Sequence, residues 1–186
     1  MSQENVEIVR QPVAVKAHPR RRVMQHLALH FPWFADVLSR GVLRLSPHSR
    51  LRQVMLRDGV RRSFEAVNRG DYEAALVTLS PDCVSIPPRQ FVLLGFDPVY
   101  RGREDRLRLQ REWAAELGEF QQENVELIDC GDQVLVLARM NGTGLSSAAP
   151  FESQVAYLIS LTAGRVVREQ MFTSHGEALE VAGLRE

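Results

Sequence analysis

The chain has 186 residues, enough to bury the core of one domain that carries an extension. Hydrophobic residues make up 45% and charged residues 25%, which is ordinary for a globular protein and excludes a low-complexity or fibrous chain. Lys and Arg together number 23, and so do Asp and Glu, so net charge gives no reason to expect a nucleic acid as partner.

The sequence also argues against secretion, a membrane span and a metal site. The first residues, 1–7, are polar and acidic, unlike a secretory signal. The most apolar stretch, Leu27 to Leu45, is interrupted by charged residues and Pro32, so it is too polar to span a bilayer. Cys83 and Cys130 lack metal-ligand spacing and are expected to be free thiols. We therefore expect a cytoplasmic protein without a metal or cofactor.

Residues 1–48 are predicted to form an N-terminal helical extension. Residues 1–19 show no helical pattern beyond a short turn near Asn5–Arg10, whereas Arg20–Leu45 favours two short helices that break at Pro32. These helices share one apolar face, which we expect to be buried on the main domain or on a second subunit. Basic residues are concentrated within 20–62, so a surface for a membrane or an acidic partner stays open as an alternative.

The remaining chain, 49–186, is predicted to form one domain that begins with helices. Apolar residues recur at intervals of three and four, and Gly70 and Asp71 mark a helix end and a helix start. The predicted helices are Ser49–Arg69, a helix from Tyr72 that Pro81 ends, and Arg103–Leu117. A short strand, Cys83–Ile86, and a long loop, Pro87–Tyr100, lie between the last two, and the length of this loop indicates a functional role.

An antiparallel meander of four strands follows. The predicted strands are Phe120–Asp129, Gln133–Thr143, Phe151–Leu161 and Arg165–Thr173. Glycines in the turns at 130–132 and 162–164 indicate hairpins, and the capping box Ser174 and Glu177 begins a last helix that ends at Gly183. Helices followed by such a meander predict an α+β fold, in which a curved antiparallel sheet wraps around helices into a cone with a pocket.

Four segments of the chain resemble the SnoaL-like branch of the NTF2-like superfamily, and their order and spacing match over about residues 55–184. The segments are Phe64-Glu-Ala-Val-Asn-Arg-Gly-Asp71, Val99-Tyr-Arg-Gly-Arg-Glu104, Glu126-Leu-Ile-Asp-Cys-Gly-Asp-Gln-Val134 and Glu177-Ala-Leu-Glu-Val-Ala-Gly183. The resemblance implies an NTF2-like α+β cone whose pocket is capped by helices, and a homodimer formed through the outer face of the sheet.

The resemblance does not carry a mechanism to this chain, because the superfamily includes polyketide cyclases, ketosteroid isomerases, dehydratases and epoxide hydrolases. Of the epoxide-hydrolase residues the chain keeps only the arginine, as Arg139, and Ser85, Pro87, Asn141 and Met171 occupy the other positions. The isomerase aspartate falls near Pro87, and the cyclase acid falls near Met171.

Strand alternation identifies candidate pocket residues more directly. One face of 133–143 carries Leu137, Arg139 and Asn141, and one face of 165–173 carries Glu169 and Met171. The resemblance places Arg139 and Met171 inside the cone, so Asn141 and Glu169 should point inward too. Two interpretations stay open: a buried Arg139–Glu169 ion pair that only orients the sheet, or Glu169 as general acid or base with Arg139 as an anion anchor.

Aromatic residues complete the candidate set. Tyr100 and Trp113 are expected to line the cavity or to pack in the core, and Tyr100 could donate a proton or a hydrogen bond. Tyr157 and Gln154 lie on opposite faces of one strand, so only one of them faces inward, and Tyr157 is counted among the ligand contacts. His175 is expected at the rim as a neighbour of the helix cap.

The first hypothesis is therefore a homodimeric SnoaL-like protein that binds a small hydrophobic molecule. One alternative is a cofactor-independent lyase, isomerase, cyclase or epoxide-hydrolase-type enzyme with Glu169 as acid or base. A second alternative is an interaction module that uses the basic N-terminal helices.

Overall fold

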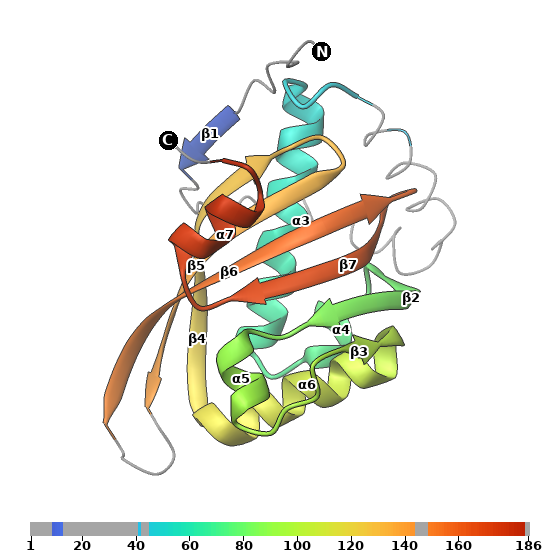
Figure 1. Cartoon of the computed structure of the whole chain (residues 1–186). Coiled ribbons are helices and arrows are strands. Elements are labelled where there is room, and N and C mark those ends of the chain that lie inside the picture. The colour runs from blue at the N-terminus through green and yellow to red at the C-terminus, as the bar shows by residue number, and fades with distance from the viewer. Residues whose placement is uncertain (1–8, 13–40, 42–44, 144–148, 185–186) are drawn as a thin grey trace.

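The computed structural model describes residues 9–12, 41, 45–143 and 149–184 (Figure 1). The helices expected within Arg20–Leu45 lie outside the described residues, apart from Gly41 and Leu45 themselves. The predicted domain boundary after residue 48 therefore stays a prediction.

Among the described residues, one curved sheet of seven strands dominates the fold, in the order β1-β4-β5-β6-β7-β2-β3 (Figure 1). The strands are β1 Val9–Pro12, β2 Leu79–Ile86, β3 Tyr100–Arg101, β4 Glu119–Asp129, β5 Gln133–Thr143, β6 Pro150–Thr162 and β7 Arg165–Phe172. The strands β4 to β7 form the predicted antiparallel meander, and β2 joins β7 in parallel.

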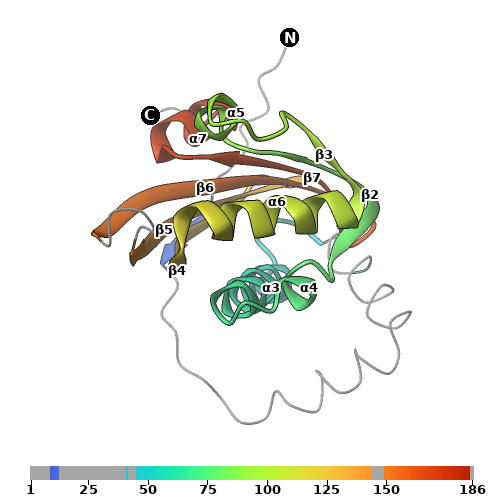
Figure 2. The same ribbon diagram turned by 90° about the horizontal axis from the view of Figure 1, so that it is seen from below.

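Helices cover both faces of this sheet. The helices are α3 Arg50–Asn68, α4 Tyr72–Ala75, α5 Arg89–Leu93, α6 Gly102–Leu117 and α7 His175–Val181. Figure 2 shows α3, α4 and α6 on one side of the strands and α7 on the other. The predicted α+β fold, with a curved sheet around helices, is confirmed.

Local signals in the sequence explain most element boundaries. Gly70 ends α3 with φ 73°, and the Asp71 side chain accepts a hydrogen bond from the Ala74 N–H at the start of α4. Ala163 and Gly164 both have positive φ, 51° and 84°, as a tight turn between two antiparallel strands requires.

Three predictions about local structure are wrong. Val9–Pro12 forms a strand against β4 instead of ending a turn, because backbone pairing with an edge strand needs no side-chain pattern. The helix after Asp71 ends at Ala75, and Pro81 lies within β2, where the register with β7 shifts between Leu79 and Val84. Proline is tolerated in a strand where the ladder is interrupted. The loop Pro87–Tyr100 contains α5.

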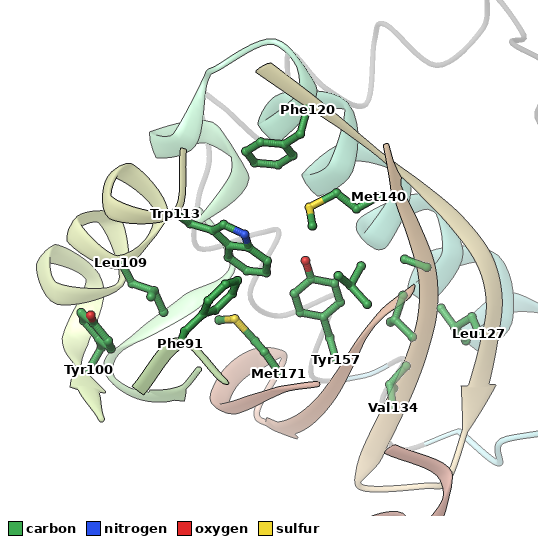
Figure 3. Packing of buried hydrophobic residues seen from close by; sticks show 13 residues of the cluster. Phe91, Tyr100, Leu109, Trp113, Phe120, Leu127, Val134, Met140, Tyr157 and Met171 are labelled. Carbon is green, nitrogen blue, oxygen red and sulfur yellow. The ribbon is translucent and has the colours of Figure 1, made fainter. Parts of the chain in front are cut away.

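Buried side chains form two main clusters on opposite faces of the sheet. The inner cluster lies between the sheet and α6, as Figure 3 shows, and contains Phe91, Tyr100, Leu109, Trp113, Phe120, Leu127, Val134, Val136, Ala138, Met140, Val155, Tyr157 and Met171. The outer cluster lies under α7 and contains Ile128, Leu135, Leu137, Ala156, Leu158, Phe172, Ala178 and Leu184. The central strands are therefore apolar on both faces, which matters for the site below.

Within the part of the chain that the structure describes, no helix is long and apolar enough to cross a bilayer.

Candidate functional site

A cavity of about 210 Å³ lies between α3 and the concave face of the sheet. Most of the residues around it are apolar. Its lining consists of Met55, Leu56, Gly59, Val60, Arg62, Ser63, Phe64, Val67, Ala75, Leu76, Thr78, Leu79, Arg106, Gln110, Gln122, Val134, Val136, Tyr157, Ile159, Leu161, Gly164, Val166 and Glu169.

Helix α3 supplies one apolar wall of the cavity. Leu56, Val60 and Val67 recur at helical spacing and lie on the face that lines the cavity. Gly59 lies in the middle of this face, and a Cβ atom built there would meet no atom within 4 Å. Glycine inside a helix is less favourable than alanine would be. We therefore interpret the open space beside Gly59 as part of the cavity, which a larger residue would reduce.

A buried ion pair between α6 and β7 forms the polar part of the lining. Arg106 Nε donates to Glu169 Oε2 at 2.6 Å, and Arg106 Nη2 donates to Oε1 at 3.4 Å. Ser85 Oγ on β2 donates to Glu169 Oε2 at 3.4 Å. Burial alone would lower the pKa of Arg106, but the charge and the hydrogen bond of Glu169, with smaller contributions from Tyr157 and Cys83, together hold that pKa above its ordinary value. The guanidinium therefore stays charged and paired.

Gln110 lies one helical turn after Arg106 and is 2% exposed. Arg106 Nη1 donates to Gln110 Oε1 at 3.0 Å. The Nε2 atom of Gln110 has no hydrogen-bond partner in the structure. Gln110 thus contributes to the lining as a residue, but its unpaired amide nitrogen is closed to solvent and to the cavity.

Tyr157 and Gln122 form a second polar group in the lining. The Tyr157 hydroxyl donates to Gln122 Oε1 at 3.0 Å, and the backbone of Gln122 exchanges two hydrogen bonds with the Asn68 side chain at the end of α3. Burial and the nearby charge of Glu169 raise the pKa of Tyr157 well above its ordinary range. Tyr157 is thus a neutral hydroxyl, and it is poorly suited to act as a phenolate base.

Cys83 lies behind this site and is fully buried, with its Sγ 4.0 Å from Ser85 Oγ. Burial, with the charge of Glu169, raises the pKa of the Cys83 thiol to about 11. A thiol in such surroundings stays protonated at neutral pH and is a structural side chain.

The structure places the predicted site residues in three groups. Glu169 and Tyr157 line the cavity. Met171, Trp113 and Tyr100 are buried in the inner cluster (Figure 3). Within this second group, the Tyr100 hydroxyl donates to Glu112 Oε2 at 2.6 Å, and in Figure 3 Tyr100 lies away from Tyr157. Burial and the bond to Glu112 raise the pKa of Tyr100 to about 12.

The third group lies on the opposite face of the sheet, so the expected inward orientation of Arg139, Asn141 and Leu137 is wrong. Arg139 is half exposed and lies 3.8 Å from Glu152, and Asn141 is exposed. Leu137 packs in the outer cluster under α7. The expected Arg139–Glu169 pair is replaced by the Arg106–Glu169 pair. Because α7 covers the outer face, alternation within β5 shows two apolar faces and does not identify the inner one.

A β-bulge explains a further difference in the lining. The register pairs Ser160 with Arg168 but Leu161 with Val166, which leaves Val167 as an extra residue in β7. Val166 and Glu169 therefore both face the cavity although they are three residues apart. A strict alternation of faces would place them on opposite sides.

Arg106, Gln110 and Gln122 are polar lining residues that the sequence analysis missed, and the sequence contains a signal for Arg106 and Gln110. Both lie at helical spacing with Leu109 and Trp113 on the buried face of α6. A charged residue and an amide within an apolar stripe are unusual, and a buried partner or a ligand is the expected reason.

His175 is tied into the fold near the start of α7. Its Nε2 lies 2.8 Å from the Ala138 carbonyl oxygen, and its backbone N–H donates to Gln154 Oε1 at 3.2 Å. Over the described ranges, no group of three or more His, Cys, Asp or Glu side chains is arranged to hold a metal ion.

Comparison with solved structures places this fold among NTF2-like proteins. An NTF2-like protein of unknown function from Burkholderia pseudomallei is 21% identical with a TM-score of 0.58, covering 67% of this chain and 95% of its own. TerC, co-crystallised with polyporic acid, is 17% identical with a TM-score of 0.57, covering 68% and 96%. A putative SnoaL-like polyketide cyclase from a Jannaschia species is 19% identical with a TM-score of 0.53, covering 69% and 91%.

The family to which the chain belongs follows from a comparison of its sequence with family models. Residues 60–169, more than half of the chain, match the SnoaL-like domain. The chain therefore belongs to the SnoaL-like family, in agreement with the resemblance of its motifs. No curated protein matches the sequence.

Proposed function

We propose that this protein binds a small, mostly apolar molecule in the cavity between α3 and the sheet. The observation that carries the proposal is the lining itself, in which apolar side chains from α3 and β5 to β7 surround a few convergent polar groups. Concave, largely apolar sites with few polar groups are typical of small-molecule binding. Burial of apolar ligand surface there would supply the affinity at about 25 cal/mol per Å².

Family membership agrees with this proposal. TerC, which shares the fold, was co-crystallised with polyporic acid, and another neighbour is named as a putative polyketide cyclase. These proteins share the fold with this chain at low identity, so they do not identify its ligand.

A second candidate function is a cofactor-independent cyclase, isomerase, lyase or hydrolase. It is favoured by one observation, the carboxylate of Glu169 in the cavity lining. Arg106 and Ser85 donate three hydrogen bonds to this carboxylate, so a role in proton transfer needs a remaining lone pair that faces the ligand. A Glu169→Gln variant that still binds the apolar probe described below but loses turnover would support this function.

We also propose that the protein is a cytoplasmic homodimer. Analytical ultracentrifugation of the full chain would test the dimer. The part of the outer sheet face near Arg139 and Glu152 is polar, whereas α7 already covers its apolar part. The proposed docking role of the basic extension concerns residues that lie mainly outside the described ranges.

Titration with tetralin, a bicyclic hydrocarbon, tests the proposed function directly. Methyl NMR of the wild-type protein should show saturable shifts of the cavity residues Val136, Ile159 and Leu161. A Gly59→Leu variant places a side chain in the cavity and should abolish these shifts, whereas Gly59→Ala, which adds one carbon, should keep most of the affinity. Saturable binding that is equal in wild type and Gly59→Leu, or no binding to wild type, would overturn the proposal.

A further inference from the structure

We infer that the bound molecule carries a carboxylate, and that Arg62 pairs with this group at the mouth of the cavity. The inference rests on the proposed function and adds the chemical class of the ligand and the direction in which the ligand lies.

Solvent exposure locates the mouth of the cavity. Among the described residues of the lining, only Arg62 and Thr78 are exposed. The Arg62 side chain is 46% exposed although the residue belongs to the lining. Long basic side chains commonly keep the charged head in water while the stem covers apolar surface. Arg62 therefore lies where the cavity meets solvent, and a ligand that extends to the mouth can reach its guanidinium.

The side chain of Arg62 is directed along α3 toward the turn that contains Gly59. In a helix, a long side chain lies over the turn that precedes its own Cα. For Arg62 this turn contains Asp58 and Gly59, and Arg62 Nη1 lies 3.6 Å from Asp58 Oδ2. A Cβ atom built at Gly59 would meet no atom within 4 Å, so there is open space beside it. The guanidinium thus lies on the same turn of the helix as this open space.

Of the described charged residues in the lining, Arg62 alone is not held by a short ion pair. Arg106 and Glu169 are buried and paired with each other, with 2.6 Å between Nε and Oε2. The 3.6 Å between Arg62 and Asp58 is too long for a hydrogen bond. Asp58 Oδ1 instead accepts a hydrogen bond from Arg61 Nη2 at 2.7 Å. The donors of the Arg62 guanidinium are therefore available to a ligand.

The arrangement of charges favours a carboxylate at the mouth over an anion deeper in the cavity. In the interior, the charge of Arg106 is already compensated by Glu169, so a second anion would be buried without a cation. At the mouth, a guanidinium can donate to both oxygens of a carboxylate while water still solvates the group. One cation with Asp58 nearby matches a single negative charge, which favours a carboxylate over a doubly charged phosphate.

A matched pair of probes tests the inference. The molecules 2-naphthoate and 2-naphthamide have the same rings and nearly the same shape, but only the first carries a negative charge. Wild-type protein at low salt should bind 2-naphthoate about fivefold more tightly, measured by NMR titration, because only the carboxylate pairs with Arg62. Raising the NaCl concentration to about 0.5 M should reduce this preference, since salt screens exposed charges.

Variants of α3 assign the preference to one side chain. Arg62→Gln should lower the affinity for 2-naphthoate about fivefold and change the affinity for 2-naphthamide less than about twofold. Arg62→Lys keeps a positive charge and should keep part of the preference. Arg69 provides the matched control, because it is exposed, lies two helical turns later and is not in the lining. Arg69→Gln removes the same charge and should change the affinity for either probe less than about twofold.

The possible outcomes separate the inference from the proposed function. Three results would overturn the inference while leaving the proposed function intact: equal binding of both probes to wild type, equal effects of Arg62→Gln and Arg69→Gln, or binding of tetralin but of neither naphthalene probe. Failure of both probes and of tetralin to bind wild type would overturn the proposed function, and the inference with it.

Discussion

Arg106 on α6 and Glu169 on β7 form a buried ion pair in the wall of the cavity, with 2.6 Å between Nε and Oε2. Their side chains are 5% and 11% exposed, so either charge would be left buried and uncompensated without the other. The pair joins the helix that carries Gln110 to the sheet that carries Tyr157, and the shape of the site depends on it.

Removal of one partner should therefore destabilise the protein strongly. We expect Glu169→Gln to lower the free energy of unfolding by about 3 kcal/mol, measured by urea denaturation. The double variant Arg106→Met, Glu169→Leu removes both charges and should recover most of that loss. A Glu169→Gln variant as stable as wild type would show that the pair does not organise the site.

A second buried ion pair joins α3 to the end of β4. Arg52 Nε and Nη2 donate to the two carboxylate oxygens of Asp129 at 2.7 and 2.8 Å, and Arg52 Nη2 also bonds the Gly131 carbonyl. We expect Asp129→Asn to cost about 3 kcal/mol in the same urea experiment. The matched control is Glu65→Gln, which breaks the partly exposed Arg61–Glu65 pair on α3 and should cost less than about 0.5 kcal/mol. Similar losses in both variants would contradict the account.

Gly59 should limit the stability of α3 while it enlarges the cavity. A Cβ atom at this position would meet no neighbour, so Gly59→Ala should raise the free energy of unfolding by about 1 kcal/mol through helix propensity. Thermal and urea unfolding would measure the change. A destabilised Gly59→Ala would mean that the space beside α3 is filled, and the proposed cavity would then be absent.

Alkaline pH should destabilise the protein partly through Cys83. The folded state raises the pKa of this thiol from about 9 to about 11, so it stays protonated after an unfolded chain would release the proton. Its contribution to stability is therefore complete below pH 9 and is lost as the pH rises through about 11.

Comparison of wild type with Cys83→Ala isolates this contribution. The difference in unfolding free energy between the two proteins should be constant below pH 9 and should change by roughly 2 kcal/mol by pH 11, to the disadvantage of wild type. A difference that does not depend on pH would show that Cys83 titrates normally.

Much of the fold could be predicted from the sequence, because its signals are local. The glycine at 70, the capping residues Asp71 and Ser174, and the turn at 162–164 lie where the chain changes direction. The strand β1 could not be predicted, since its partner β4 lies more than a hundred residues away and the pairing is made by the backbone.

The candidate site could be predicted only in part. Glu169 follows from alternation with Met171, which the family resemblance places inside the cone. Alternation within β6 left open whether Tyr157 or Gln154 faces inward, and the structure places Tyr157 in the lining. The orientation of Arg139 could not be derived, because α7 makes the outer face of β5 as apolar as the inner one. The ion-pair partner of Glu169 comes instead from α6, where the helical spacing of Arg106 with Leu109 was the available signal. The bulge at Val167 is set by pairing with β6, which the sequence of β7 alone does not show.

The location of a bound probe tests the central claim most directly. Intermolecular NOEs between tetralin and the methyl groups of Val136, Ile159 and Val60 would place the molecule between α3 and the sheet, as the account predicts. NOEs to residues outside this lining, or a complete absence of saturable binding, would contradict it.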